Sequence, residues 1–208
     1  MILAIDTTHD IGSIALLSEG SLLEQVSLKP TDGYSETLFI EIENLLLRHG
    51  MELSQLSAIA AAQGPGTFTG VRLGLTAAKG FAEALDKPIF AISNLKALAT
   101  ISNEPLRAPF YDARRGDVYA ALPDGSEHVL PFAAFLEKLP PATELISFDF
   151  SNYPSPGYSQ LVAPREIAAA VGLLAWRRFQ NGERPNPAEI DASYVRRSDA
   201  ESQWKEAI

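Results

Sequence analysis

The sequence predicts a mixed α/β fold in which antiparallel strands and helical crossovers build one domain. Three short apolar strands come first, at residues 2–8, 11–18 and 21–28, and the turn residues between them indicate a meander. A helix, a strand, a second helix and another strand follow, so the order is β-β-β-α-β-α-β. A doubly wound parallel sheet would instead alternate strands and helices from its start.

The elements after the meander each carry a local signal. The stretch "SETLFIEIENLLLRHG" predicts a helix, because Ser35 is a candidate N-cap and Gly50 occupies the position of a C′ glycine. A short helix over 94–101 has Ser93 or Asn94 as its cap. The other elements predicted in this half are a buried strand at 56–63, a helix at 69–85 and a strand at 87–93.

The pattern changes near Pro105, which indicates a second lobe. The stretch "APFYDARRGDVYAALP" predicts a hairpin that turns at Arg114 to Gly116. A helix at 131–139, a strand at 144–150, a loop rich in proline, serine and glycine, and a helix at 163–182 follow. We expect a boundary near 100–106 and two lobes, 1–104 and 105–208. The last helix and the polar tail are candidates to pack back on the first lobe.

Composition excludes several classes of protein. The 208 residues include no cysteine, so disulfides and thiolate chemistry are excluded, and the net charge of −9 argues against unaided binding of nucleic acid. No run approaches eighteen consecutive apolar residues, so we expect no membrane span. The first residues lack the basic region of a signal peptide, and a cytoplasmic location is expected.

A glycine-rich segment, "GPGTFTGVRLGLTAAKG", follows the buried strand at 56–63. Its spacing fits neither the Walker phosphate loop nor the dinucleotide fingerprint. A turn with Thr67 at the N-terminus of a helix could hold an anion through its backbone amides. A purely structural turn is the alternative, and the spacing favours it.

The helical part of this segment has a stripe of small residues, and each glycine within it costs roughly 1 kcal/mol relative to alanine. Such a stripe lets another helix approach closely. On the preceding helix the predicted core stripe is Leu38, Phe39, Ile42, Leu45 and Leu46, whereas Ile40 and Leu47 lie on the opposite side. We therefore predict a seam for a partner, formed by Ile40, Leu47, Gly70, Gly74, Ala77 and Ala78. The alternative is that the C-terminal helix covers this face within the monomer.

The candidate catalytic groups do not make a complete site. The three histidines are widely spaced and form no H-x-x-x-H pair, so no metal site is predicted, and no G-x-S-x-G elbow occurs. Asp6, at the end of the first strand, could position magnesium or phosphate, but a strand-end Asp satisfied by turn amides explains it equally well. The absence of a nucleophile, base and orienting group counts against an enzyme.

Five stretches together resemble the bacterial TsaB family, formerly called YeaZ. They are "ILAIDTT…SIALL", "GPGTFTGVRLGLTAAKG", "IFAISNLKALA", "YDARRGDVY" and "SYVRRSDAESQWKEA". The resemblance covers residues 1–120 and the tail, and "GPGTFTGVR" carries most of its specificity. It implies an actin-like or sugar-kinase (ASKHA) ATPase fold of two related lobes.

The resemblance also implies a function. The family belongs to the machinery that makes N6-threonylcarbamoyladenosine at position 37 of ANN-decoding tRNAs. It is similar to TsaD, the catalytic subunit, which carries an H-x-x-x-H metal pair that this chain lacks; many family members have a histidine where this chain has Tyr34. The implied role is a non-catalytic scaffold that binds TsaD through its first two helices, with TsaE joining as an ATPase.

The same resemblance sets the expected ligands and partners. No cofactor is expected in the isolated chain, ATP or ADP and metal are expected on the partner subunits, and tRNA is reached only through the complex. A homodimer is expected when the partner is absent. The alternative is an active small kinase or hydrolase of the same fold. In that enzyme, Asp6, Thr7, Thr8 and Thr67 would contact phosphate. In a non-catalytic relative, the same four residues would be the remnant of a phosphate site.

Overall fold

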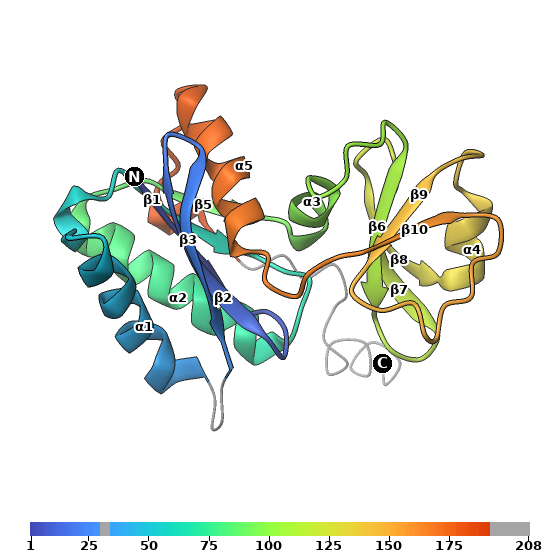
Figure 1. Cartoon of the computed structure of the whole chain (residues 1–208), viewed down its shortest axis with the longest axis horizontal. Coiled ribbons are helices and arrows are strands. Elements are labelled where there is room, and N and C mark those ends of the chain that lie inside the picture. The colour runs from blue at the N-terminus through green and yellow to red at the C-terminus, as the bar shows by residue number, and fades with distance from the viewer. Residues whose placement is uncertain (30–33, 192–208) are drawn as a thin grey trace, which may run out of the picture.

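The structure, a computed structural model, describes residues 1–29 and 34–191. This part of the chain forms two five-stranded sheets with helices beside them (Figure 1). The strands are β1 (Ile2–Asp6), β2 (Gly12–Ser18), β3 (Ser21–Leu28), β4 (Ala58–Ala62), β5 (Ile89–Ile92), β6 (Arg107–Asp112), β7 (Asp117–Ala121), β8 (Glu127–Pro131), β9 (Glu144–Ser147) and β10 (Ser159–Val162). The α-helices are α1 (Tyr34–Arg48), α2 (Phe68–Leu85), α3 (Asn94–Ala99), α4 (Phe132–Glu137) and α5 (Ala168–Gln180), and the 3₁₀ turns are η1 (Leu53–Gln55) and η2 (Pro187–Glu189).

The first sheet confirms the predicted mixture of a meander with crossovers. Its order is β3-β2-β1-β4-β5, with β2 antiparallel to both neighbours and with β1, β4 and β5 parallel to one another. Two of the predicted caps are confirmed: Ser93 accepts a hydrogen bond from the Lys96 amide, and Gly50 adopts φ +61° after α1. The assignment of Ser35 as the N-cap of α1 is wrong, because the helix already begins at Tyr34. Parallel strands are joined through helices on the faces of the sheet, so β1 is buried on both sides.

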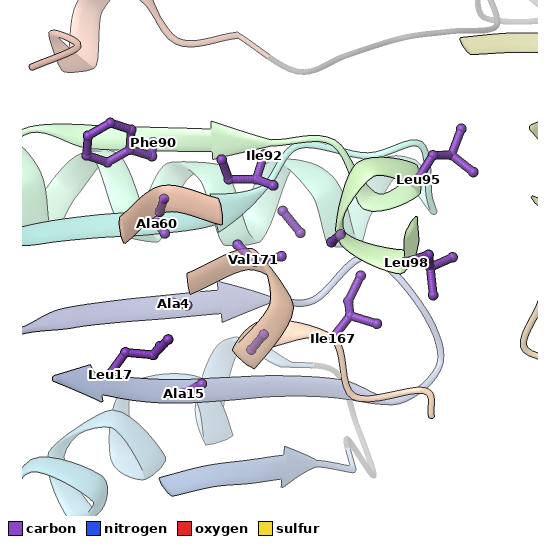
Figure 2. Packing of buried hydrophobic residues seen from close by; sticks show 14 of the residues in the cluster. Ala4, Ala15, Leu17, Ala60, Phe90, Ile92, Leu95, Leu98, Ile167 and Val171 are labelled. Carbon is purple, nitrogen blue, oxygen red and sulfur yellow. The ribbon is translucent and has the colours of Figure 1, made fainter. Parts of the chain in front are cut away.

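Two hydrophobic layers sandwich this sheet. Alternate β1 side chains point to opposite faces, with Leu3 and Ile5 in the layer under α1 and α2, and Ile2 and Ala4 in the layer under α5. Figure 2 shows the second layer, in which Val171 and Ile167 lie over the sheet strands. Helix α5 therefore covers the face of the sheet that α1 and α2 leave open.

The second layer extends into the second lobe. Leu95 and Leu98 of α3 belong to the same buried cluster as Ile2, and so do Tyr111 of β6 and Ile146 of β9. Figure 1 shows α3 between the two sheets. The two lobes are therefore joined by one continuous apolar core rather than by a solvated linker.

The second sheet has the order β10-β9-β6-β7-β8 and packs on α4 around Phe110 and Phe135. The predicted hairpin is confirmed as β6 and β7, which turn with Arg114, Arg115 and Gly116 at positive φ. Two short edge strands, β8 and β10, were not predicted.

The chain returns to the first lobe after β10. The Ala168 amide of α5 donates a hydrogen bond of 3.0 Å to the Ser13 hydroxyl of β2. A Cβ on Gly172 would lie 2.2 Å from Leu17 Cδ1, so only glycine lets α5 approach β2 this closely. Beyond α5, the Ile89 amide donates to the Pro185 carbonyl, and Ile190 packs against the layer under α1 and α2.

The predicted small-residue seam is wrong in its assignment of α2. A Cβ on Gly70 would lie 2.0 Å from the Thr7 carbonyl oxygen, and a Cβ on Gly74 would lie 2.7 Å from Thr7 Oγ1. Ala77 and Ala78 are buried in the same layer. The stripe of Gly70, Gly74, Ala77 and Ala78 therefore packs inside the chain and not on a helix of a partner: its two glycines meet Thr7, directly after β1, and its two alanines are buried in the core.

The exposed residues of α1 also differ in part from the prediction. Ile40 and Leu47 are exposed, as the pattern indicated, but Phe39 is exposed as well and does not join the core stripe. The alternative of a monomer in which the last helix covers this face is wrong, since α5 packs on the opposite face of the sheet. No helix within residues 1–29 and 34–191 combines the length and apolar character needed to span a bilayer.

We predict opposite effects for alanine at two glycines of α2. Gly70→Ala should lower the free energy of unfolding by at least about 2 kcal/mol, because its methyl group would overlap the backbone of β1. Gly80→Ala should raise it by about 0.5–1 kcal/mol, because a Cβ there meets no atom within 4 Å and alanine has the higher helix propensity. Urea unfolding of both variants measures the difference, and equal effects would contradict this packing.

Candidate functional site

The carboxyl end of β1 is a closed hydrogen-bonded network. Asp6, Thr7 and Thr8 are all fully buried. The Thr8 amide and hydroxyl both donate to Asp6 Oδ1, at 2.9 and 2.6 Å. The strand-end aspartate thus accepts from the turn that follows it, as the structural interpretation of the sequence expects.

The second oxygen of the same carboxyl, Asp6 Oδ2, is buried without a hydrogen-bond partner among the described residues. Burial raises the pKa of Asp6 above its ordinary value, against the opposing effects of nearby His9 and of the Thr8 hydrogen bonds. A carboxylate with one unpaired oxygen in an apolar setting is costly, so burial favours the neutral acid.

Asn94, the first residue of α3, joins this network to the loop before α2. Its Nδ2 donates to Thr8 Oγ1 at 2.5 Å, and its Oδ1 accepts from the Gly64 amide at 3.0 Å. The carboxamide is fully buried. It therefore fixes the ends of β1 and β4 to each other.

The N-terminus of α2 packs directly on the same strand end. Thr67 caps the helix by accepting from the Gly70 amide, while its own amide donates to the Thr8 carbonyl at 2.8 Å. The Thr7 hydroxyl donates to the Gly70 carbonyl at 2.7 Å, and a Cβ on Gly66 would lie 2.6 Å from the Thr8 carbonyl oxygen. The glycines allow strand and helix terminus to touch.

The four residues proposed to contact phosphate, Asp6, Thr7, Thr8 and Thr67, therefore do lie together. Their hydroxyl groups, however, are engaged with one another and with the backbone of α2. The geometry favours the structural turn over an anion site. Three of the four side chains are fully buried and present nothing to solvent.

The second lobe closes over this strand end. The His9 ring lies 4.9 Å from the rings of both Tyr111 and Phe148, in edge-on contacts, and the Tyr111 hydroxyl donates to the Pro65 carbonyl. Burial lowers the pKa of His9, although Asp6 and Asp10 oppose this effect. Aromatic side chains thus fill the space between the lobes at the end of β1.

Two polar contacts reinforce this closure at its rim. Arg165 pairs with Asp10 at 2.9 Å across the two halves, and the Ser93 hydroxyl donates to Glu127 at 2.5 Å. The first pair is solvent-exposed and contributes little on its own. The apolar contacts between the lobes therefore dominate.

Tyr34 links the first residue of α1 to the same region. Its hydroxyl donates to the His9 carbonyl at 2.6 Å, and its ring lies against Gly12, where a Cβ would approach the ring to 2.9 Å. Burial raises the pKa of Tyr34 to about 12. The sequence indicated only that Tyr34 replaces a histidine, and nothing in its pattern pointed to this contact.

The described residues also offer little that would hold the nucleotide and metal of an actin-like ATPase. No group of three or more His, Cys, Asp or Glu side chains with metal-binding spacing occurs within 1–29 and 34–191. The carboxyl at the end of β1 is fully buried, and the nearby His9 ring packs against Tyr111. The residues present do not fit a bound nucleotide at this place.

A second candidate site is the outer surface of α1 and α2. Seven large hydrophobic side chains are exposed among the described residues, and four of them lie on these two helices. We call Phe39, Ile40, Leu47 and Phe68 the α1–α2 surface; their exposed fractions are 48%, 57%, 66% and 52%. Ile40 and Leu47, seven residues apart, share one side of α1.

The aromatic members of the α1–α2 surface are held in place. The Phe39 ring lies 5.8 Å from the ring of Phe81, which bridges α1 to α2. The Arg72 guanidinium lies 3.7 Å from the centre of the Phe68 ring, in cation–π geometry. Figure 1 shows both helices on the outer face of the first sheet, away from the second lobe.

Comparison with known proteins agrees with this fold. Residues 28–129 match the family model of TsaD, described as tRNA N6-adenosine threonylcarbamoyltransferase. The chain is 30% identical to "tRNA threonylcarbamoyladenosine biosynthesis protein TsaB" of Bacillus subtilis, over 99% of this chain and 98% of that protein. It is 36% identical to the TsaB protein of Haemophilus influenzae, over 86% of this chain and 75% of that protein.

A solved structure gives the same result in three dimensions. YeaZ from Pseudomonas aeruginosa superimposes with a TM-score of 0.76 at 26% sequence identity, over 93% of this chain and 98% of that one. The two mixed-sheet lobes are thus an actin-like fold of the sugar-kinase type. Within that class, the chain belongs to the TsaB family.

We predict that Asp6→Asn stabilises the protein in a pH-dependent way. The folded pKa of Asp6 lies above its ordinary value of 3.8, so the folded protein retains a proton that the unfolded chain has released. Stability from this group is therefore present at low pH and falls as pH rises from about 4 through the folded pKa.

The neutral asparagine removes that loss. Unfolding free energies should match those of the unsubstituted protein near pH 4 and exceed them at pH 8, where the ionised Asp6 carboxylate would lack a partner for Oδ2. Parallel urea titrations at the two pH values measure this. A variant that is less stable than its parent at pH 8 would show that the folded protein favours the ionised carboxylate.

Proposed function

We propose that this chain acts in the biosynthesis of tRNA threonylcarbamoyladenosine as a non-catalytic subunit that binds TsaD through α1 and α2. The observation that carries the proposal is the α1–α2 surface, a group of exposed apolar side chains on two adjacent helices of a TsaB-family fold. Isolated exposed apolar residues are ordinary, but three on one helix, with a fourth exposed on the adjacent helix, indicate an interaction site.

The interface assigned here differs from the one that the sequence pattern predicted. Ile40 and Leu47 remain in it, Phe39 and Phe68 join it, and the small residues of α2 leave it because they pack on β1. Burying one such side chain contributes about 1.5–3 kcal/mol. Two or three of them supply a substantial part of the affinity of a stable heterodimer.

The closed junction between the lobes supports a non-catalytic role. An ATP-using enzyme of this fold would need a cleft that admits nucleotide, whereas here Tyr111, Phe148 and His9 occupy the space beside Asp6. A continuous apolar core joins the lobes and opposes their separation. ATP or ADP and metal are accordingly assigned to the partner subunits, one of which is the ATPase TsaE.

The charge of the chain supports indirect contact with tRNA. A net charge of −9 disfavours binding to a phosphate backbone, so tRNA is reached through the assembled complex. In the absence of TsaD the same apolar surface can pair with a second copy of the chain. Binding of TsaD would displace this second copy.

We predict that charge placed on the α1–α2 surface abolishes the complex. Ile40→Glu and Leu47→Glu should each weaken binding to TsaD by about tenfold to 100-fold, since each buries a carboxylate where an apolar group packed. Val162→Glu is the matched control, because Val162 is 66% exposed on β10 of the second lobe. Calorimetric titration with purified TsaD measures the dissociation constants, and equal weakening by all three variants would place the interface elsewhere.

We predict that the isolated chain neither binds nor hydrolyses ATP. Calorimetry with magnesium-ATP should give no saturable heat up to about 1 mM nucleotide, which corresponds to a binding free energy weaker than about −4 kcal/mol. A phosphate-release assay should give only the background rate. Micromolar binding together with turnover would contradict the non-catalytic role and would favour the small kinase or hydrolase.

A further inference from the structure

The contacts that close the lobes lead, through short chains of residues, to the start of both partner-binding helices. Tyr111 belongs to β6 of the second lobe, and its side chain lies in the core that joins the lobes. We propose that Tyr111 is a positioning residue that fixes the N-terminal ends of α1 and α2, and thereby the arrangement of the α1–α2 surface. The consequence for partner binding rests on the proposed function; the anchoring itself does not.

The first connection runs from Tyr111 to α2. Its hydroxyl donates to the carbonyl of Pro65, which lies two residues before Thr67, the N-cap of α2. Burial raises the pKa of Tyr111 well above its ordinary value, so the hydroxyl keeps its proton and remains a donor. This hydrogen bond ties a residue of the second lobe to the loop from which α2 starts.

The second connection runs from Tyr111 to α1. The edge-on contact of 4.9 Å places its ring against His9, whose carbonyl accepts from the Tyr34 hydroxyl at 2.6 Å. Tyr34 is the first residue of α1 and is itself buried. The packing of the His9 ring between Tyr111 and Phe148 therefore fixes the carbonyl that holds this helix end.

The contacts at Tyr34 and Pro65 hold the N-terminal ends of α1 and α2, whereas the proposed TsaD-binding residues Ile40 and Leu47 lie further along α1. With a rise of 1.5 Å per residue, Ile40 is about 9 Å and Leu47 about 20 Å from Tyr34 along the axis. A small change of direction at Tyr34 becomes a larger displacement of Leu47. Tyr111 is buried at the junction and is absent from the α1–α2 surface, so any effect it has on binding is transmitted through the helix ends.

The test compares three substitutions that each remove one phenolic hydroxyl and keep the ring. Tyr111→Phe removes the donor at the junction. Tyr34→Phe breaks the α1 connection alone. Tyr158→Phe is the control, because its hydroxyl donates to the Leu136 carbonyl within the second lobe. All three lose a hydrogen bond to a backbone carbonyl.

Hydrogen exchange of the isolated full chain tests the anchoring directly. Tyr111→Phe removes the bond to Pro65 but keeps the ring against His9. It should therefore speed exchange about twofold to tenfold at the first internally bonded amides of α2, 71–75, as expected for loss of one hydrogen bond, and leave 38–42 of α1 unchanged. Tyr34→Phe should speed exchange at 38–42 and leave 71–75 unchanged. The control should leave both segments at the rates of the parent protein.

Titration with TsaD then tests the consequence for binding. Tyr111→Phe and Tyr34→Phe should each weaken the affinity about threefold to tenfold, and the control should not. Exchange at 71–75 that is the same in Tyr111→Phe as in the control overturns the inference, whatever the affinity. A further variant, Tyr111→Leu, also removes the ring that contacts His9, so it should speed exchange at 38–42 as well; unchanged exchange there overturns the α1 connection.

The two proposals fail in distinguishable ways. If the parent protein does not bind TsaD, the proposed function is wrong, yet the exchange rates still decide whether Tyr111 anchors the helices. If the parent binds and the exchange rates change while the affinity does not, anchoring stands and its effect on the partner surface is overturned.

Discussion

The close approach of the β1 end to the start of α2 is the constraint on which the rest of the structure depends. The Thr7 carbonyl and the Gly70 backbone lie so near each other that no side chain fits between them. This approach sets the direction of α2, and the Asp6, Thr8 and Asn94 network locks the loop before it. Because the second lobe then packs on His9 and Pro65 at the same point, one small region fixes two helices and two lobes together.

The same region also joins the two lobes. Side chains from both lobes meet in one apolar core, and α3 supplies the layer between the sheets. Separating the lobes would expose Tyr111, Ile146 and Leu98, at a cost of roughly 25 cal/mol for each Å² of apolar surface. The aspartate at the end of β1 is buried with one unpartnered oxygen among the described residues, and burial raises its pKa.

Much of this fold could be predicted from sequence, because periodicity reports which face of an element is buried. The meander, the crossover helices and the β6–β7 hairpin were predictable on that basis. Edge strands β8 and β10 are short and half exposed, so they carry no alternation strong enough to detect. The glycine stripe of α2 was recognised as a close-packing face, but a helix pattern cannot identify what packs on it, and the neighbour was β1.

The candidate sites were predictable to different degrees. Ile40 and Leu47 could be identified because they lie opposite the core stripe of α1, whereas Phe39 lies at the edge of that stripe and was misassigned. Contacts between distant residues, such as Tyr34 with His9 or Tyr111 with Pro65, depend on how the lobes pack. Local sequence patterns contain no information about them.

The return of α5 to the first sheet has a consequence for synthesis on the ribosome. The Ala168 amide and the Ser13 hydroxyl are joined across 155 positions of sequence, so the first lobe is discontinuous and the second is inserted within it. While the chain emerges, one face of the first sheet, with Ile2, Ala4 and Phe90, waits uncovered until α5 is made. Contacts of such long range slow folding, and the bare sheet is open to aggregation meanwhile. The nascent chain therefore passes through a stage in which its α1 and α2 side can already be packed while its opposite side still lacks α5.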